Sequence, residues 1–284
     1  MRYESPTTTK EAVTLLSKEK GKAFVLAGGT DLLARLRMDM IDPDLMVDIK
    51  HIPAMNEIKN TASGFKIGAA VPGVKLGRDK ALAKAWPGVV EAANLIGSRQ
   101  IQGRCTIVGN LCNASPAADS VPAMIAAGAK ALVVGKKRRT VPVEDIVTGP
   151  GKTSLAKGEI IEAITLPKRA PNSGDAYLRM IPRTEMDIAI VGAGVNLTLK
   201  KGVIASARVA LGAVAPTAIL VKAAADAIIG TKLDDDALTA LAEACSKACK
   251  PIDDKRGTIE YRKKVAGVIA ARAAKIAYAR AGGK

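Results

Sequence analysis

The most constraining feature of the sequence is a short apolar strand that runs directly into a glycine turn and then into a helix. Residues Ala23–Leu26 read AFVL, and the turn is Ala27-Gly28-Gly29-Thr30-Asp31. Residues 32–40 place leucines on one side of a predicted helix, and a second apolar strand is expected at 45–49. This order predicts a small parallel unit with its turn at the carboxyl end of a strand, where open α/β sheets place ligands.

A second stretch of small and polar residues, Thr106–Asp119, reads TIVGNLCNASPAAD and is expected to form loops rather than a helix or a strand. Such residues let the backbone turn tightly and leave amide N–H groups free to face an anion. The two stretches together suggest two backbone cradles around one phosphate-rich ligand. Neither is a GxGxxG motif or a P-loop, which disfavours a nucleoside triphosphate. A Gly-Gly turn before a helix, taken alone, is more often only a turn.

The rest of the chain alternates between strand and helix patterns without an internal repeat. A helix is expected over residues 5–19, where Thr8 and Glu11 have capping-box spacing. The other expected elements are a hairpin at 56–70, helices at 76–85, 89–96 and 121–127, a hairpin at 129–143, strands at 159–166, 176–182, 188–199 and 203–211, and helices near 217–229, 235–249 and 258–281.

This order predicts an α+β protein in three parts. Residues 1–55 would form an N-terminal α/β part and residues 56–170 a second, α+β part. Residues 175–284 would form a C-terminal α+β domain, with a three-stranded antiparallel sheet followed by helices. The segment 168–175, KRAPNSGD, is rich in Pro, Gly and polar residues and is expected to be the linker.

The charge of the chain leaves several classes of partner open. A net charge of +16 fits binding to nucleic acid, binding to an anionic membrane, or a basic surface exposed to solvent. The basic residues are spread along the sequence, and aromatic residues make up only 2%, which disfavours stacking on unpaired bases. No run reaches the roughly 18 apolar residues of a membrane helix. With no secretory leader at the start, a cytoplasmic protein is expected.

The cysteines and the single histidine give no metal-binding pattern. None of the cysteines forms a CxxC motif, and His51 is isolated, so we expect no metal on this chain. Free thiols fit a reducing compartment. The four cysteines are Cys105, Cys112, Cys245 and Cys249.

Ordered motifs along nearly the whole chain resemble the FAD-binding (medium) subunit of the molybdenum hydroxylase family, which includes xanthine, nicotinate and carbon monoxide dehydrogenases. The motifs are VLAGGTDLL at 25–33, TIVGN at 106–110, EIIEAITLP at 159–167, R-x-x-x-D-I-A at 183–189, and RGTIEYR at 256–262. The resemblance implies an FAD-binding region in two parts, of the PCMH (vanillyl-alcohol-oxidase-like) type, followed by a C-terminal α+β domain.

The resemblance also implies a flavin site, with no catalytic side chain required of this chain. Backbone amides at Gly28, Gly29, Gly109 and Asn110 would hold the pyrophosphate, and Arg179 would stabilise the reduced flavin. Val108 stands where the family usually has glycine, and Arg179 where it has a lysine. The matching positions are Val25, Leu26, Ala27, Gly28, Gly29, Thr30, Asp31 and Leu32, then Thr106, Ile107, Val108, Gly109 and Asn110, and finally Asp119, Ile161, Tyr177 and Arg179.

Several of these positions also have purely structural interpretations. Asp119 could be only the N-cap of the following helix, and Ile161 could be only a core residue of a strand. Tyr177 could be a packed, hydrogen-bonded residue, and Arg179 a solvated charge on a strand. The turn at 27–31 contains neither His nor Cys, so the resemblance implies non-covalent FAD.

For function, the resemblance implies an electron-transfer subunit. Electrons would pass from a molybdenum cofactor on a large subunit, through [2Fe–2S] clusters on a small subunit, to FAD on this chain and then to NAD or another acceptor. A heterohexamer with two copies of each chain is expected. The alternatives are a stand-alone flavin reductase of the cell-wall-precursor type, which would need no partners, and a basic nucleic-acid-binding module.

Overall fold

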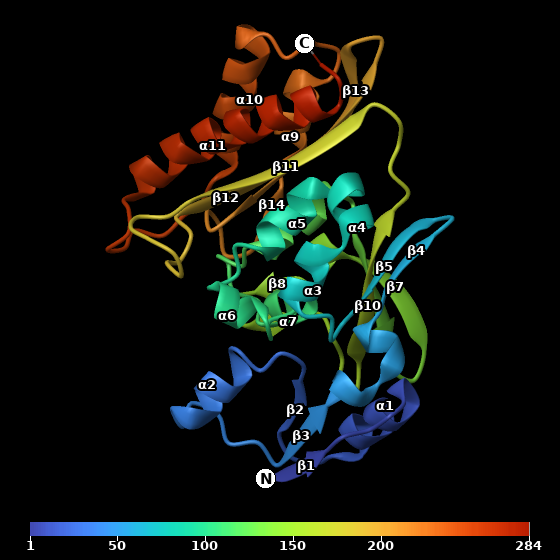
Figure 1. Cartoon of the computed structure of the whole chain (residues 1–284). Helices are drawn as coiled ribbons and strands as arrows, with labels where there is room; N and C mark the ends of the chain where they lie inside the picture. Colours follow the sequence, from blue (N-terminus) through green and yellow to red (C-terminus); the bar gives the residue numbers. More distant parts are fainter. Residues whose placement is uncertain (284) are drawn as a thin grey trace.

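The computed structural model describes residues 1–283, and its first sheet contains the predicted strand, turn, helix, strand unit (Figure 1). Its strands lie side by side in the order β1-β3-β2, and both pairs are parallel. The strand at the very N-terminus was not expected from the sequence. The elements are β1 (Arg2–Glu4), α1 (Thr9–Lys18), β2 (Ala23–Leu26), α2 (Leu32–Arg37) and β3 (Leu45–Asp48).

The middle of the chain forms a five-stranded sheet in the order β4-β5-β10-β6-β7, with all neighbours antiparallel. One buried core joins this sheet to the first sheet and to the helices between them. The elements are β4 (Ile58–Thr61), β5 (Gly64–Gly68), α3 (Gly73–Arg78), α4 (Lys80–Ala85), α5 (Pro87–Ala93), α6 (Arg99–Gln102), α7 (Ile107–Cys112), α8 (Ser120–Ala126), β6 (Lys130–Val134), β7 (Arg138–Pro142) and β10 (Ile160–Pro167), with a small hairpin of β8 (Val147–Gly149) and β9 (Lys152–Thr153) and 3₁₀ turns at Ile49–His51, Pro53–Asn56 and Val143–Asp145.

The expectation that Thr106–Asp119 contains only loops is wrong, because six of its residues form α7. Thr106 is the N-cap, and its Oγ1 accepts a hydrogen bond of 2.9 Å from the Gly109 amide. Ile107 and Leu111, four residues apart, are buried on one face of the helix. The cap and these two anchors therefore stabilise a helix in a stretch whose small residues suggested turns.

The last third of the chain is an antiparallel sheet in the order β11-β12-β13-β14, covered by three helices (Figure 1). It has four strands rather than the expected three. Ile219 and Leu220 pair with β13, so the helix expected near 217–229 begins later. The elements are β11 (Ser173–Met180), β12 (Val191–Lys200), β13 (Val203–Gly212), β14 (Ile219–Leu220), α9 (Lys222–Ile228), α10 (Asp235–Ala248) and α11 (Ile259–Arg280).

The segment expected to be a linker makes one of the polar contacts between the two cores. The Arg169 guanidinium lies 4.2 Å from the centroid of the Trp86 ring and 3.1 Å from an Asp175 carboxylate oxygen. Asp175 also accepts a 2.9 Å hydrogen bond from the amide of Gly88 on α5. The α+β fold class is confirmed, while the division at 1–55, 56–170 and 175–284 stays a prediction. Within the described residues, the helices include none that is both long and apolar enough to cross a membrane.

Candidate functional site

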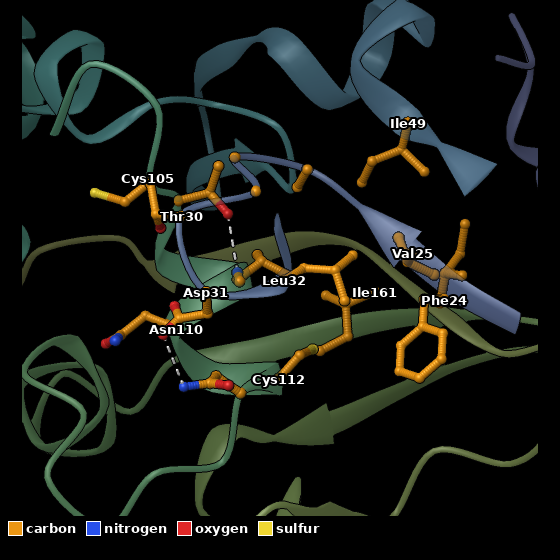
Figure 2. A pocket seen from close by; sticks show the side chains of 18 of the residues that line it. Phe24, Val25, Thr30, Asp31, Leu32, Ile49, Cys105, Asn110, Cys112 and Ile161 are labelled. Carbon is orange, nitrogen blue, oxygen red and sulfur yellow. Dashed lines mark hydrogen bonds between the residues drawn. The ribbon is translucent and has the colours of Figure 1, made fainter. Parts of the chain in front are cut away.

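A cavity of about 450 Å³ opens between the first turn, α7 and strand β10 (Figure 2). This size is typical of small-molecule and cofactor pockets. Figure 2 shows Thr30 and Asp31 from the turn, Leu32 from α2, Asn110 and Cys112 from α7, and Ile161 from β10 around the pocket. Twelve of the residues expected from the sequence line it, namely Val25, Ala27, Gly28, Gly29, Thr30, Asp31, Leu32, Thr106, Val108, Gly109, Asn110 and Ile161.

The first turn lines this pocket and contains a run of backbone amides without an acceptor. Within residues 1–283, the amides of residues 28–32 donate to no other group of the chain. Gly29 has a φ of +77°, which only glycine adopts readily, and its carbonyl accepts from Leu33 at the start of α2. Successive unpaired N–H groups in such a turn are suited to an anion such as a pyrophosphate.

The second cradle differs from what the sequence suggested. The Gly109 amide is used by Thr106 Oγ1, and the Asn110 amide donates 2.9 Å to the Thr106 carbonyl, so neither is free for a phosphate. In the described chain, the amides of residues 106–110 without an acceptor belong to Thr106, Ile107 and Val108, and the last two lie in the first turn of α7. Val108 is in a helix, where φ is negative, so a side chain is tolerated where the family usually has glycine.

Side chains around the pocket are held by neighbours rather than left free. Asn110 Oδ1 accepts from both the amide and the hydroxyl of Ser120, at 3.1 and 2.7 Å. Asn113 donates to Asp31 at 3.3 Å. Burial raises the pKa of Asp31, and the charge of Arg35 partly offsets this. The polar side chains of Asn110, Asn113 and Asp31 are therefore held in place by the protein itself.

Five predicted residues do not line the cavity. Leu26 and Ile107 are buried in the core beneath it. The other three form one buried cluster behind the pocket wall: Arg179 Nη1 lies 2.9 Å from Asp119 Oδ2, and the Tyr177 hydroxyl donates 3.3 Å to Asp119 Oδ1. Arg179 also donates 2.9 Å to the Leu95 carbonyl, next to Ile96, which lines the pocket.

The environment of this cluster changes its acid–base behaviour. Burial raises the pKa of Asp119 to about 6, although the ion pair with Arg179 opposes the increase. Burial also raises the pKa of Tyr177 well above its ordinary value. Asp119 precedes α8 but makes no side-chain capping bond, so the interpretation as a simple N-cap is wrong. Arg179 is largely buried, so it is not a solvated surface charge.

Several residues of the pocket were missed by sequence reasoning. Phe24 on β2 and Leu155 after the β8–β9 hairpin line it, and so do two cysteines. Burial raises the pKa of Cys105 to about 11 and that of Cys112 to about 12, so both thiols are neutral near pH 7. Cys105 directly precedes Thr106, and that adjacency is the one signal in the sequence that could have placed it here. In the described residues, no group of three His, Cys, Asp or Glu side chains could hold a metal.

A pocket bounded by a glycine turn at the carboxyl end of β2 and by the first turn of α7, with unpaired amides and apolar walls, is typical of a dinucleotide-binding α+β protein. Residues 1–169 match the family model described as "FAD binding domain in molybdopterin dehydrogenase", and residues 176–277 match "CO dehydrogenase flavoprotein C-terminal domain". The chain therefore belongs to this family and is an FAD-binding oxidoreductase subunit, as the motifs suggested.

Named relatives extend over the full chain. The chain is 32% identical over 279 residues to the carbon monoxide dehydrogenase medium chain of Hydrogenophaga pseudoflava, covering 98% of this chain and 97% of that protein. It is 30% identical over 285 residues to the putative xanthine dehydrogenase FAD-binding subunit of Escherichia coli K12, covering 99% and 97%. The solved CO dehydrogenase from Oligotropha carboxidovorans superposes with a TM-score of 0.94 at 33% identity, covering 99% and 98% of the two chains.

The residues present fit FAD. The free amides of residues 28–32 can donate hydrogen bonds to the negative pyrophosphate, and glycine at position 28 lets the backbone of the turn come close to the second loop. Val25, Ile96, Leu155 and Ile161 supply apolar wall for ring systems. The two carboxylates of the lining are Asp31 and Glu159, and Glu159 is ion-paired with Arg139 at 2.7 Å.

Proposed function

We propose that this chain carries electrons through FAD from the iron–sulfur subunit of a molybdenum-containing hydroxylase to NAD or another acceptor. The observation that carries the proposal is the turn at residues 28–32, whose five unpaired amides line the pocket. When bound, FAD supplies the redox chemistry, since it can exchange electrons singly or in pairs. The molybdenum cofactor and the [2Fe–2S] clusters would lie on partner subunits, in a heterohexamer with two copies of each chain, in the cytoplasm.

In this proposal the side chains bind and orient rather than react. The amides of residues 28–32, with that of the lining residue Val108, would offset the pyrophosphate charge. Arg179, paired with Asp119, supports the carbonyl of Leu95 next to the lining residue Ile96, and its charge would help to stabilise the reduced flavin from outside the lining. The neutral thiols of Cys105 and Cys112 act as small apolar groups in the lining.

The test begins with the full chain purified alone and with its partner subunits. We expect a yellow protein that releases one FAD per chain on acid treatment. Thr30→Asp places a negative charge beside the phosphate cradle and should weaken FAD binding more than tenfold. Thr14→Asp, on the exposed side of α1, is the matched control and should bind FAD normally.

Two results would contradict the proposal. A colourless chain that cannot be reconstituted with FAD would remove the cofactor assignment altogether. An FAD-loaded chain that is never recovered with large and small subunits, and that reduces its substrate alone, would favour the stand-alone flavin reductase. Rapid mixing of the reduced complex with NAD⁺ then decides whether NAD is the acceptor.

A further inference from the structure

The helix beside the pocket, α2, and the turn that follows it expose most of their apolar side chains to solvent. Of the helices in residues 1–283, α2 alone has no buried residue. Leu33 is 42% exposed, Met38 62% and Met40 63%. In Figure 1, α2 stands at the margin of the fold, away from the large sheets. We call Leu33, Arg37, Met38 and Met40 the α2 surface.

The backbone of α2 and of the turn after it is hydrogen-bonded, although these side chains are exposed. The Met38 amide donates 3.1 Å to the Ala34 carbonyl, and the Met40 amide donates 2.9 Å to the Arg35 carbonyl. Asp39 between them has a φ of +53°, a conformation that aspartate tolerates better than most residues. The turn therefore holds both methionines outward in a defined direction. A helix of six residues is too short to be stable by itself in water, so its apolar side chains need a covering surface.

The composition of the α2 surface matches the centre of a protein–protein interface. Methionine and arginine are enriched in interfaces, and lysine and glutamate are depleted. Around the apolar side chains lie two exposed cations, Arg35 and Arg37, and the carboxylate of Asp39. A protein surface with apolar residues and an acidic rim is the complementary partner.

The position of α2 beside the pocket indicates which protein covers the α2 surface. Leu32 and Arg35, on the same short helix, line the pocket, whereas Leu33, Met38 and Met40 are not part of its lining. A protein seated on the α2 surface would therefore stand at the rim of the flavin pocket. We propose that the α2 surface docks the electron-donating iron–sulfur subunit through an apolar patch with an acidic rim. This inference rests on the proposed function.

The test uses the three subunits expressed together, with Met38→Asp/Met40→Asp in this chain. Charges in a dry interface are costly, so we expect the iron–sulfur subunit recovered with this chain to fall at least tenfold. The FAD content should stay at the wild-type level, because neither residue lines the pocket. Ile252→Asp is the matched control: Ile252 is 69% exposed but lies between α10 and α11, and its variant should assemble normally.

A charge variant tests the acidic rim separately. Arg37→Glu should slow association with the iron–sulfur subunit severalfold and should weaken the salt dependence of the rate. Each of three results would overturn the inference: normal assembly of the double-aspartate variant, loss of FAD from that variant, or a wild-type chain that self-associates alone through these methionines. A wild-type chain that binds neither FAD nor partners would instead overturn the proposed function.

Discussion

The Cβ atom that Gly28 lacks would lie 2.1 Å from the carbonyl oxygen of Arg104, so the two turns of the pocket meet backbone to backbone. No side chain can move aside to relieve this contact. The distance explains why a glycine stands at position 28 whether or not a ligand is bound. It also means that the stability of the empty chain depends on this residue.

Gly28→Ala should therefore destabilise the chain even without FAD. We expect a loss of about 2 kcal/mol, the usual cost of overpacking a close contact, with an accompanying loss of FAD binding. Gly149→Ala is the control, because no atom lies within 4 Å of its Cβ position and its φ is not positive. Urea unfolding of the two FAD-free variants measures the difference. Equal stabilities would show that the two turns can separate.

Thr106→Ala should remove the cap of α7. The hydroxyl oxygen of Thr106 accepts the Gly109 amide, and losing such a cap costs about 1 kcal/mol. Thr106→Ser keeps the oxygen and should lie close to the wild type. Urea midpoints measure the effect on stability. A serine variant as unstable as the alanine variant would mean that packing of the threonine methyl, rather than capping, stabilises the helix.

The buried pair of Asp119 and Arg179 should make stability depend on pH. The pKa of Asp119 is about 6 in the folded chain, above its ordinary value of 3.8. The folded chain therefore holds this proton more tightly, so the resulting stability is complete below about pH 4 and is lost as the pH rises through 6.

Asp119→Asn cannot titrate, so it should gain stability relative to the wild type as the pH rises. Between pH 4 and pH 7 the difference in unfolding free energy should move in favour of the variant by about 2 kcal/mol. Denaturant unfolding at half-unit pH steps measures it. Parallel profiles for the two proteins would contradict a raised pKa for this carboxyl group.

Arg169→Ala should loosen the junction between the two cores. It removes the cation above Trp86 and leaves the carboxylate of Asp175 buried without its ion-pair partner, which costs about 3 kcal/mol near pH 8. Arg183→Ala breaks a pair whose arginine is 73% exposed and screened by water, so it should change stability far less. Trp86 is the single tryptophan, so its fluorescence reports the junction directly. Identical emission and stability in both variants would contradict this role.

Local sequence patterns predicted most of the helices, strands and turns, because most of these elements are stabilised by residues close together in the sequence. The Gly28-Gly29 turn follows from an apolar strand that meets two glycines and then a leucine stripe. Capping at Thr8 was predicted and is present, since its side chain accepts from the Glu11 amide. The predictions failed where contacts with residues distant in the sequence determine the secondary structure. Ile219 and Leu220 are a strand because β13 offers them hydrogen bonds, and α7 forms because Ile107 and Leu111 are buried by other elements.

For the candidate site too, most of the residues in contiguous stretches line the pocket, whereas three residues brought together by the fold do not. Twelve of the seventeen predicted residues line the pocket, because a turn that binds a dinucleotide is a contiguous stretch of chain. The three residues at positions 119, 177 and 179 are drawn together by an ion pair across 60 residues of sequence, which no local pattern reveals. Whether they influence FAD stays a prediction.

By itself, the sequence determined the strand, turn, helix, strand order of residues 23–49, the Gly28-Gly29 turn and the family, because these depend on the residue types of short stretches. Only the tertiary structure decided which amides remain unpaired, since Thr106 takes the Gly109 and Asn110 donors while residues 28–32 keep theirs. It also decided that Asp119 and Arg179 pair behind the pocket wall and that Met38 and Met40 stay exposed. Hydrogen bonding and burial depend on what lies nearby in space, and residues far apart in the sequence supply most of those neighbours.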